Sequence, residues 1–295
     1  MYDFNNLYEP KSLKEALELK AKYPKALLLA GGSDILIKLR DGKFVGSDII
    51  SIYMLDEMRG IELEEDGTIV VRPLTSFTDV AESPILKKHL PVLSEAVEHI
   101  GAVQVRNIGT IGGNICNGVT SADSASTLKA YDATLKIQSV NGTRILPYLD
   151  FNIAPGKVDL KEDEILTEIR IAKSSYENCY GHYIKYAKRK AMDIATLGCS
   201  VNVKLTDDKK KIEQLRIAFG VAAPTPIRSF SAEEGTKNHL LNEKLIEHIK
   251  EGSLKDVMPR TSWRASKEFR LHLVQELAAR ATLKAIQRAG GSIDE

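Results

Sequence analysis

Two glycine-rich segments constrain this chain more than any other feature. The first, residues 27–36, reads LLLAGGSDIL and places Gly31 and Gly32 directly after a short apolar run. The second, residues 109–114, reads GTIGGN and is followed by polar residues up to position 124. Paired glycines let a backbone approach a ligand closely, and their amides can form an anion-binding concavity. We expect both segments to be turns. For the first one alone, a tight strand-to-helix turn without a ligand is the alternative.

Neither segment matches the common nucleotide-binding fingerprints. No Gly-x-Gly-x-x-Gly follows an expected strand, and neither Gly-Lys pair (residues 42–43 and 156–157) precedes Ser or Thr. These spacings exclude the Rossmann and P-loop interpretations. The polar groups of Asn114, Thr120 and Asp123 suit a ligand that has both hydrogen-bond donors and acceptors. The second segment therefore favours ligand binding over a purely structural turn.

Strands precede helices in the second half of the chain, which favours an α+β fold over alternating βαβ units. In the first half we expect a helix from Ser12 to Pro24, strands at 26–30, 49–52 and 165–171, hairpins turning at 66–67 and 141–142, and a helix at 91–100. In the second half we expect strands at 183–187, 197–205 and 212–219, then helices at 241–251 and 266–287. We place the domain boundary in the polar segment 173–178, which leaves domains of residues 1–173 and 179–289.

Composition excludes several function classes. Lys and Arg total 41 against 40 Asp and Glu, so the net charge of +1 gives no reason to expect nucleic-acid binding. No apolar run reaches the ~20 residues of a membrane helix, and we expect a cytoplasmic protein. The three cysteines are Cys116, Cys179 and Cys199, with no Cys-x-x-Cys pair. We therefore expect no disulfide framework, iron–sulfur cluster or other metal site in this chain.

The two glycine-rich segments resemble the FAD-pyrophosphate segments of molybdenum hydroxylase flavoprotein subunits. The likeness continues through residues 115–124, 219–226 and 263–270, so it covers nearly the whole chain. It is strongest to the flavoprotein subunits of bacterial xanthine dehydrogenases. The resemblance implies a two-lobed FAD-binding domain of the vanillyl-alcohol-oxidase (PCMH) type, with lobes at about 1–55 and 56–173. A smaller α+β C-terminal domain of the carbon monoxide dehydrogenase flavoprotein type would follow.

The resemblance also implies the residues that bind the cofactor. The glycine-rich segments would wrap the pyrophosphate, so a side chain at Gly112 would occupy the place of the pyrophosphate. Asp123 would bond the cofactor, Ile100 and Ile165 would line it, and Lys185 would lie near the flavin ring; an ordinary solvent-facing lysine is the alternative for Lys185. The full expected set is Leu27, Leu28, Leu29, Ala30, Gly31, Gly32, Ser33, Asp34, Ile100, Gly109, Thr110, Ile111, Gly112, Gly113, Asn114, Asp123, Ile165 and Lys185. No residue of this chain is expected to be catalytic or to ligate a metal.

A function follows from the same resemblance. A molybdopterin-containing subunit would oxidise the substrate, a 2Fe-2S subunit would relay electrons to FAD on this chain, and NAD would accept them. The three chains would form a heterotrimer that can dimerise, with hypoxanthine and xanthine as substrates and urate as product. The alternatives are a flavoprotein subunit of nicotinate or carbon monoxide dehydrogenase, a free-standing FAD oxidase, and a flavin-binding module without a redox role. The lack of clustered cysteines argues against 4-hydroxybenzoyl-CoA reductase, whose flavoprotein subunit carries a four-iron cluster.

Overall fold

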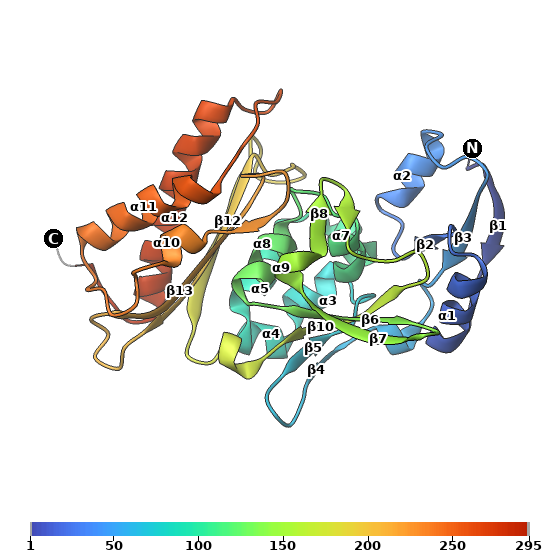
Figure 1. The fold of residues 1–295 in the computed structure, drawn as a ribbon, viewed down its shortest axis with the longest axis horizontal. Helices are drawn as coiled ribbons and strands as arrows, with labels where there is room; N and C mark the ends of the chain where they lie inside the picture. Colours follow the sequence, from blue (N-terminus) through green and yellow to red (C-terminus); the bar gives the residue numbers. More distant parts are fainter. Residues whose placement is uncertain (1, 294–295) are drawn as a thin grey trace.

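Three main β-sheets, each with its own helices, follow one another along the chain in the computed structural model, which describes residues 2–293 (Figure 1). The strands are β1 (Phe4–Tyr8), β2 (Leu27–Leu29), β3 (Ser47–Ser51), β4 (Ile61–Leu63), β5 (Ile69–Val71), β6 (Thr134–Ser139), β7 (Gly142–Pro147), β8 (Asn152–Ala154), β9 (Lys157–Val158), β10 (Ile165–Ile171), β11 (Tyr180–Tyr186), β12 (Leu197–Leu205), β13 (Ile212–Gly220) and β14 (Ile227–Arg228). The helices are α1 (Leu13–Lys22), α2 (Ile35–Arg40), α3 (Phe77–Glu82), α4 (Pro84–His89), α5 (Pro91–Glu98), α6 (Val103–Ile108), α7 (Ile111–Cys116), α8 (Asp123–Ala130), α9 (Tyr148–Phe151), α10 (Phe230–Glu233), α11 (Glu243–Asp256) and α12 (Lys267–Arg288), with 3₁₀ turns at Asp56–Met58 and Lys173–Ser175.

The first sheet is small and parallel, with strand order β1-β3-β2. Ser12 begins α1, because its hydroxyl accepts a hydrogen bond from the Glu15 amide at 3.2 Å. Strand β2 is an edge strand, and the chain leaves it directly into Gly31-Gly32 before α2. The first glycine-rich segment therefore lies at the open edge of this lobe.

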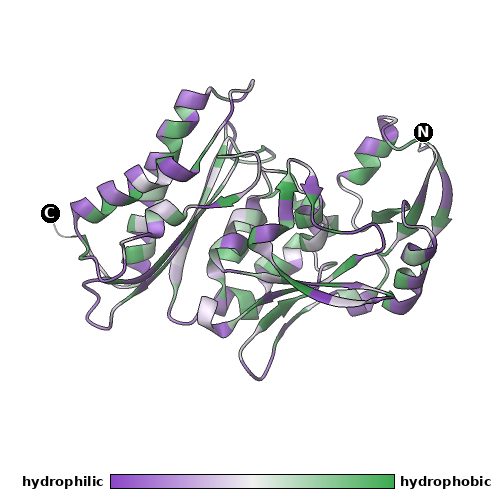
Figure 2. Cartoon of the chain, viewed as in Figure 1, coloured by the Kyte–Doolittle hydropathy of each residue, from purple (hydrophilic) through white to green (hydrophobic). Residues whose placement is uncertain are grey.

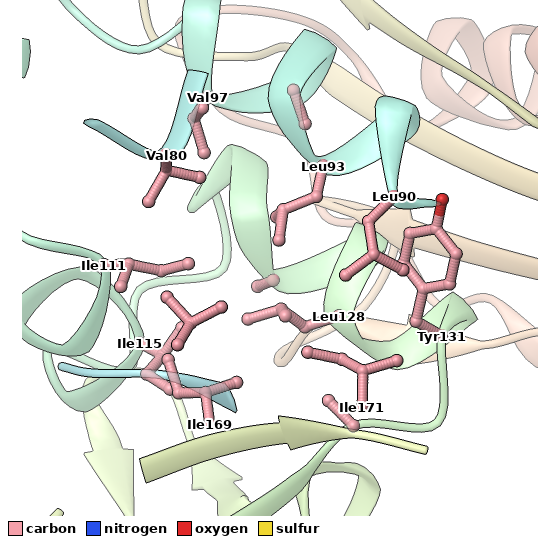
Figure 3. Close-up of a cluster of buried hydrophobic side chains, with 14 of the residues drawn as sticks. Val80, Leu90, Leu93, Val97, Ile111, Ile115, Leu128, Tyr131, Ile169 and Ile171 are labelled. Carbon is pink, nitrogen blue, oxygen red and sulfur yellow. The ribbon is translucent and has the colours of Figure 1, made fainter. Parts of the chain in front are cut away.

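The second sheet is antiparallel, with strand order β4-β5-β10-β6-β7, and shares its core with α3, α4, α5, α7 and α8. Figure 3 shows the core between them, with Ile111 and Ile115 of α7 close to Leu128 of α8 and Ile169 of β10. All four side chains are fully buried. Because its apolar side is held in this core, α7 turns Gly113 outward, while Gly112 stays buried.

The third sheet, β11-β12-β13-β14, forms the C-terminal domain with α10, α11 and α12. Strand β12 is almost wholly buried, since α12 covers one face of the sheet and α8 of the preceding domain packs on the other. At that second face the Asn202 side-chain amide donates to the Ala130 carbonyl at 3.2 Å. In Figure 2 the apolar sides of α11 and α12 lie toward this sheet and their polar sides face outward.

The α+β class and the two hairpins predicted from the sequence are confirmed. Gly67 has a positive φ angle in the turn that joins β4 to β5, and Gly142, also with a positive φ angle, begins β7 directly after the turn at residues 140–141. The prediction of a turn at residues 109–114 is wrong for most of its length, because a helix begins at Ile111. Short elements β14 and α10 were also not predicted, since two or four residues carry no periodic pattern.

Candidate cofactor site

A cleft of about 680 Å³ lies between the first two lobes. Its wall comes from segments that are far apart in the sequence and lie within residues 20–52, 73–77, 110–117 and 158–166. The volume falls within the range of about 300–1,000 Å³ that is usual for small-molecule and cofactor sites. The cleft is therefore large enough for a sizeable organic ligand.

The two glycine-rich segments meet at this cleft. A Cβ atom added to Gly31 would lie 1.7 Å from the carbonyl oxygen of Ile108, a distance that no side chain can tolerate. Gly32 has a φ of +75°, which favours glycine. A glycine at position 31 thus allows the backbones of two different lobes to touch.

The first segment offers free hydrogen-bond donors. The backbone amides of Gly31, Gly32, Ser33 and Asp34 make no hydrogen bond to any other residue between 2 and 293. Consecutive unpaired amides beside a glycine turn form a concavity that suits an anion. All four residues line the cleft. This stretch can therefore bind the phosphates of a ligand.

In the second segment, the backbone amides of residues 111–114 already donate hydrogen bonds within the protein. The amides of Ile111 and Gly112 donate to the carbonyls of Thr75 and Pro73 at 3.1 and 2.8 Å. The Gly113 amide donates to the hydroxyl of Thr110 at 3.1 Å, so Thr110 caps α7. This segment can offer a ligand its exposed surface, but the amides at the start of α7 are not free donors.

The reason expected for Gly112 is wrong. A Cβ atom at Gly112 would lie 2.3 Å from the Cβ of Pro73 and 2.7 Å from its carbonyl oxygen, not in the place of a ligand. A glycine is needed there because α7 packs closely against Pro73. At Gly113 an added Cβ atom would meet only the Thr110 hydroxyl at 2.9 Å and Ala30 at 3.9 Å. Gly113 is exposed, so it is Gly113 that presents open backbone to the cleft.

One cation joins the two lobes at the cleft. The Lys38 ammonium lies 2.5 Å from an oxygen of Asp34 and 2.9 Å from the side-chain oxygen of Asn117. Lys20, also on the wall, is buried and donates to the carbonyls of Pro24 and Ala26. Burial lowers the pKa of Lys20. Of these two cations, Lys38 is the one paired with a half-exposed carboxylate, and it can turn toward an anion in the cleft.

Twelve of the expected cofactor-binding residues line the cleft and six do not. The twelve are Leu27, Leu28, Ala30, Gly31, Gly32, Ser33, Asp34, Thr110, Gly112, Gly113, Asn114 and Ile165. The six outside the cleft wall are Leu29, Ile100, Gly109, Ile111, Asp123 and Lys185. Ile111 points into the core, and Gly109 packs against the ring of Phe77.

Asp123 and Lys185 form a separate buried cluster. One oxygen of Asp123 accepts from the Tyr183 hydroxyl at 2.6 Å, and the other lies 2.9 Å from the Lys185 ammonium. Lys185 also donates to the carbonyl of His99 at 2.8 Å, next to Ile100. Burial raises the pKa of Asp123, while Lys185 and Tyr183 counteract this by favouring the carboxylate. The cluster fastens the C-terminal domain to the preceding domain, and the solvent-facing alternative for Lys185 is wrong because its side chain is buried.

Sequence reasoning missed much of the cleft wall. The missed residues include Lys20, Lys25, Lys38, Phe44, Pro73, Phe77, Asn117, Leu160, Lys161 and Glu164. Lys38 could have been found, because it lies one helical turn after Asp34, the spacing of an ion pair. The others lie on separate segments and share no local motif.

Cys116 lines the cleft, and burial raises the pKa of its thiol to about 12, so it stays protonated. No cluster of three or more potential metal ligands occurs between residues 2 and 293. Within the same range, no helix has both the length and the apolar character to cross a membrane.

Comparison with known proteins identifies the family. Residues 2–174 match the model of the FAD binding domain in molybdopterin dehydrogenase, and residues 182–285 match the carbon monoxide dehydrogenase flavoprotein C-terminal domain. The chain belongs to the FAD-binding subunits of the molybdenum hydroxylases. Among such subunits it is 45% identical to the xanthine dehydrogenase FAD-binding subunit of Escherichia coli O157:H7, covering 99% of this chain and 100% of that protein.

Two further flavoprotein subunits place the chain within this family. The nicotinate dehydrogenase FAD-subunit of Eubacterium barkeri is 35% identical, over 70% of this chain and 71% of that protein. A chain of carbon monoxide dehydrogenase from Hydrogenophaga pseudoflava superimposes with a TM-score of 0.92 at 28% identity, over 98% of this chain and 99% of that chain. The two-domain order, FAD-binding then flavoprotein C-terminal, is thus confirmed, and FAD is the cofactor of this chain. The unpaired amides of residues 31–34, the close backbone approach at Gly31 and the volume of the cleft fit a dinucleotide.

Proposed function

We propose that this chain is the FAD-carrying electron-transfer subunit of a cytoplasmic xanthine dehydrogenase. It would accept electrons from a 2Fe-2S subunit and pass them to NAD, while a molybdopterin-containing subunit oxidises hypoxanthine and xanthine to urate. The full-length identity of 45% to a xanthine dehydrogenase FAD-binding subunit supports this assignment. The flavin supplies the ability to take up and release electrons. The residues of this chain bind and orient it.

In the proposed binding mode, the first glycine-rich segment donates hydrogen bonds to the cofactor and the second allows its close approach. The amides of residues 31–34 donate to the pyrophosphate, because four consecutive amides are unpaired there, whereas those of residues 111–114 donate within the protein. Gly113 and Asn114 lie opposite and let the ligand approach α7 closely. Ile165, at the start of β10, supplies an apolar wall.

The residues outside the cleft wall have a second proposed role. As the family resemblance implies, Asp123 would bond the cofactor and Lys185 would lie near the flavin ring. Asp123 precedes Ser124, whose hydroxyl donates to the side-chain oxygen of Asn114 at 2.7 Å. The buried cluster is thereby connected to the cleft wall through Asn114. In this proposal Asp123 and Lys185 position the domains around the flavin.

Purification of the native complex tests the assignment. We expect the chain to co-purify with a molybdenum subunit and a 2Fe-2S subunit, and the complex to oxidise hypoxanthine and xanthine with NAD⁺. Nicotinate oxidation without purine oxidation would favour the nicotinate dehydrogenase alternative, which the identity of 35% also supports.

The isolated chain provides a second test. Loaded with FAD, it should catalyse NADH-dependent reduction of a dye and no purine oxidation. Purine turnover by this chain alone would contradict a subunit role, and would favour a free-standing oxidase.

A further inference from the structure

One hydroxyl of helix α8 connects this helix to the wall of the cleft. The Ser124 hydroxyl donates to the side-chain oxygen of Asn114 at 2.7 Å. Ser124 is fully buried on α8, whereas Asn114 lies on α7 and lines the cleft. The two helices pack against each other, with Ile115 of α7 close to Leu128 of α8 in the core (Figure 3). The hydrogen bond therefore joins two elements whose relative positions are fixed by packing.

The other hydroxyls of α8 show that such a bond is not a general property of this helix. Ser126 and Thr127 are also buried there, but their hydroxyls have no hydrogen-bond partner among residues 2–293. Of the three hydroxyl side chains on α8, only that of Ser124 is paired within this range, and its partner belongs to the cleft wall. Ser124 itself is not part of that wall.

The bond from Ser124 decides which end of the Asn114 amide remains available. An asparagine side chain has an oxygen that accepts hydrogen bonds and a nitrogen that donates two. Ser124 donates to the oxygen, and the nitrogen makes no hydrogen bond to any residue between 2 and 293. Without the hydroxyl, nothing would prevent the amide from turning by 180° and exchanging these two groups. Ser124 thus leaves Asn114 with a free donor.

A free donor at this position matches the chemistry of the opposite wall. A Cβ atom added to Gly113, the residue before Asn114, would lie 3.9 Å from the side chain of Ala30. The two glycine-rich segments are therefore close together here, and the unpaired amides of residues 31–34 follow directly after Ala30. Donors on both sides of the cleft suit one anionic group between them, since hydrogen bonds to a charged acceptor are the stronger ones.

We propose that Ser124 is a positioning residue for FAD, which holds the Asn114 side chain so that its amide nitrogen donates to the pyrophosphate from the side opposite residues 31–34. Ser124 acts through Asn114 and does not touch the cofactor. The inference rests on the proposed binding mode and deepens it, because it adds a second source of donors. It is independent of the substrate that the complex oxidises.

A double-mutant cycle on the full chain tests the proposal. FAD dissociation constants are measured by titration of the apoprotein for Ser124→Ala, Asn114→Ala and the variant with both changes. Asn114→Ala should weaken FAD binding about tenfold or more, because a hydrogen bond to a charged group is lost. Ser124→Ala should weaken it about threefold or more, because the amide is then free to turn. In the double variant, Ser124→Ala should add less than about twofold, since no amide is left to position.

Ser126→Ala is the matched control for loss of a buried hydroxyl. Ser126 lies on the same helix and is equally buried, but its hydroxyl bonds nothing among residues 2–293. This variant should bind FAD with the affinity of the unmodified chain. Thermal unfolding of the apoproteins shows whether all variants are folded.

Asn114→Asp tests the orientation of the amide, because it replaces the donor nitrogen by an oxygen at nearly the same volume. It should weaken FAD binding more than Asn114→Ala does, since a carboxylate oxygen would then face the phosphates. If Asn114 instead donated to Ser124 and offered its oxygen to FAD, Asn114→Asp would bind FAD at least as tightly as Asn114→Ala.

Three results would overturn the proposal. The first is an unchanged FAD affinity of Ser124→Ala. The second is an equal loss on Ser124→Ala with and without Asn114, which would indicate a structural effect on the helix. The third is binding of FAD by Asn114→Asp that is as tight as binding by Asn114→Ala. An unchanged affinity of Asn114→Ala would contradict the proposed binding mode itself, and that result is distinct because it does not depend on Ser124.

Discussion

The two glycine-rich segments look alike in the sequence and do different things in the structure. Residues 31–34 leave an edge strand with their amides unpaired, whereas Ile111 and Gly112 donate to the backbone of Thr75 and Pro73. The first segment therefore provides hydrogen-bond donors, and the second provides a closely packed wall. Glycine repeats thus indicate close backbone approach, but only the hydrogen-bond pattern tells whether the neighbour is a ligand or the protein itself.

Replacement of Gly31 should reduce FAD binding more than any other substitution, because it forces the two glycine-rich segments apart. In Gly31→Val the new side chain would overlap the Ile108 carbonyl, so the segments must separate and FAD binding should be lost. The flavin-to-protein absorbance ratio of the folded variant measures this. Gly290→Asn is the control, because a Cβ atom at Gly290 meets nothing within 4 Å and asparagine tolerates the positive φ of +84° at this position. A folded Gly31→Val protein with a full complement of FAD would contradict the account.

Substitutions at Gly112 and Gly113 should separate stability from binding. Gly112→Val drives a side chain into Pro73, and overpacking of this kind typically costs about 1–3 kcal/mol of unfolding free energy. Gly113→Val projects into the cleft, so it should weaken FAD binding with a smaller loss of stability. Thermal unfolding of the apoprotein and FAD titration distinguish the two effects. The comparison fails if Gly113→Val binds FAD as tightly as the unmodified chain.

Removal of the Thr110 hydroxyl should mainly lower stability, and removal of the Ser33 hydroxyl should mainly weaken FAD binding, with smaller effects than the glycine substitutions. Thr110 caps α7, so Thr110→Ala should destabilise the apoprotein by about 1 kcal/mol. Ser33 is exposed at the cleft, so Ser33→Ala should change stability by less than about 0.5 kcal/mol. It should instead weaken FAD binding several-fold, by loss of one hydrogen bond. Equal loss of stability in both variants would remove the distinction.

Lys38→Met should give the smallest effect. The ion pair with Asp34 is partly exposed, and such pairs contribute about 0–1 kcal/mol. Loss of the bridge between the lobes should speed FAD dissociation by less than about fivefold, which stopped-flow flavin fluorescence can measure. Lys14→Met is the control, because Lys14 is exposed on α1 and its ammonium lies 4.0 Å from the Glu18 carboxylate, too far for a strong ion pair. Faster release in the control as well would show that general surface charge, not the bridge, is responsible.

The sequence predicted features whose signals are local. The Ser12 cap, the Asp66-Gly67 hairpin and the apolar run before Gly31 each lie within a few residues. Residues 109–114 were misinterpreted because glycines disfavour helices. The opposing signal was present, since Ile111 and Ile115 are one helical turn apart and follow a capping Thr. Packing of these two side chains in the core outweighed the low helix propensity of glycine.

The rest of the cleft could not be predicted from a single sequence. Pro73 and Lys161 reach the wall only because two lobes fold against each other. The same holds for the contact between Gly31 and Ile108, which decides where the cleft lies. No periodic pattern specifies which loops of separate lobes meet. The buried pairing of Asp123 with Lys185 likewise depends on how the C-terminal domain packs on α8.

Backbone NMR of the apoprotein during titration with FAD tests the central claim most directly. The amide proton resonances of residues 31–34 should shift downfield as these groups gain hydrogen bonds to the pyrophosphate. Those of residues 111–114, whose amides already donate within the protein, should change less. If the second group shifts and the first does not, or if neither responds to saturating FAD, the proposed binding mode is contradicted.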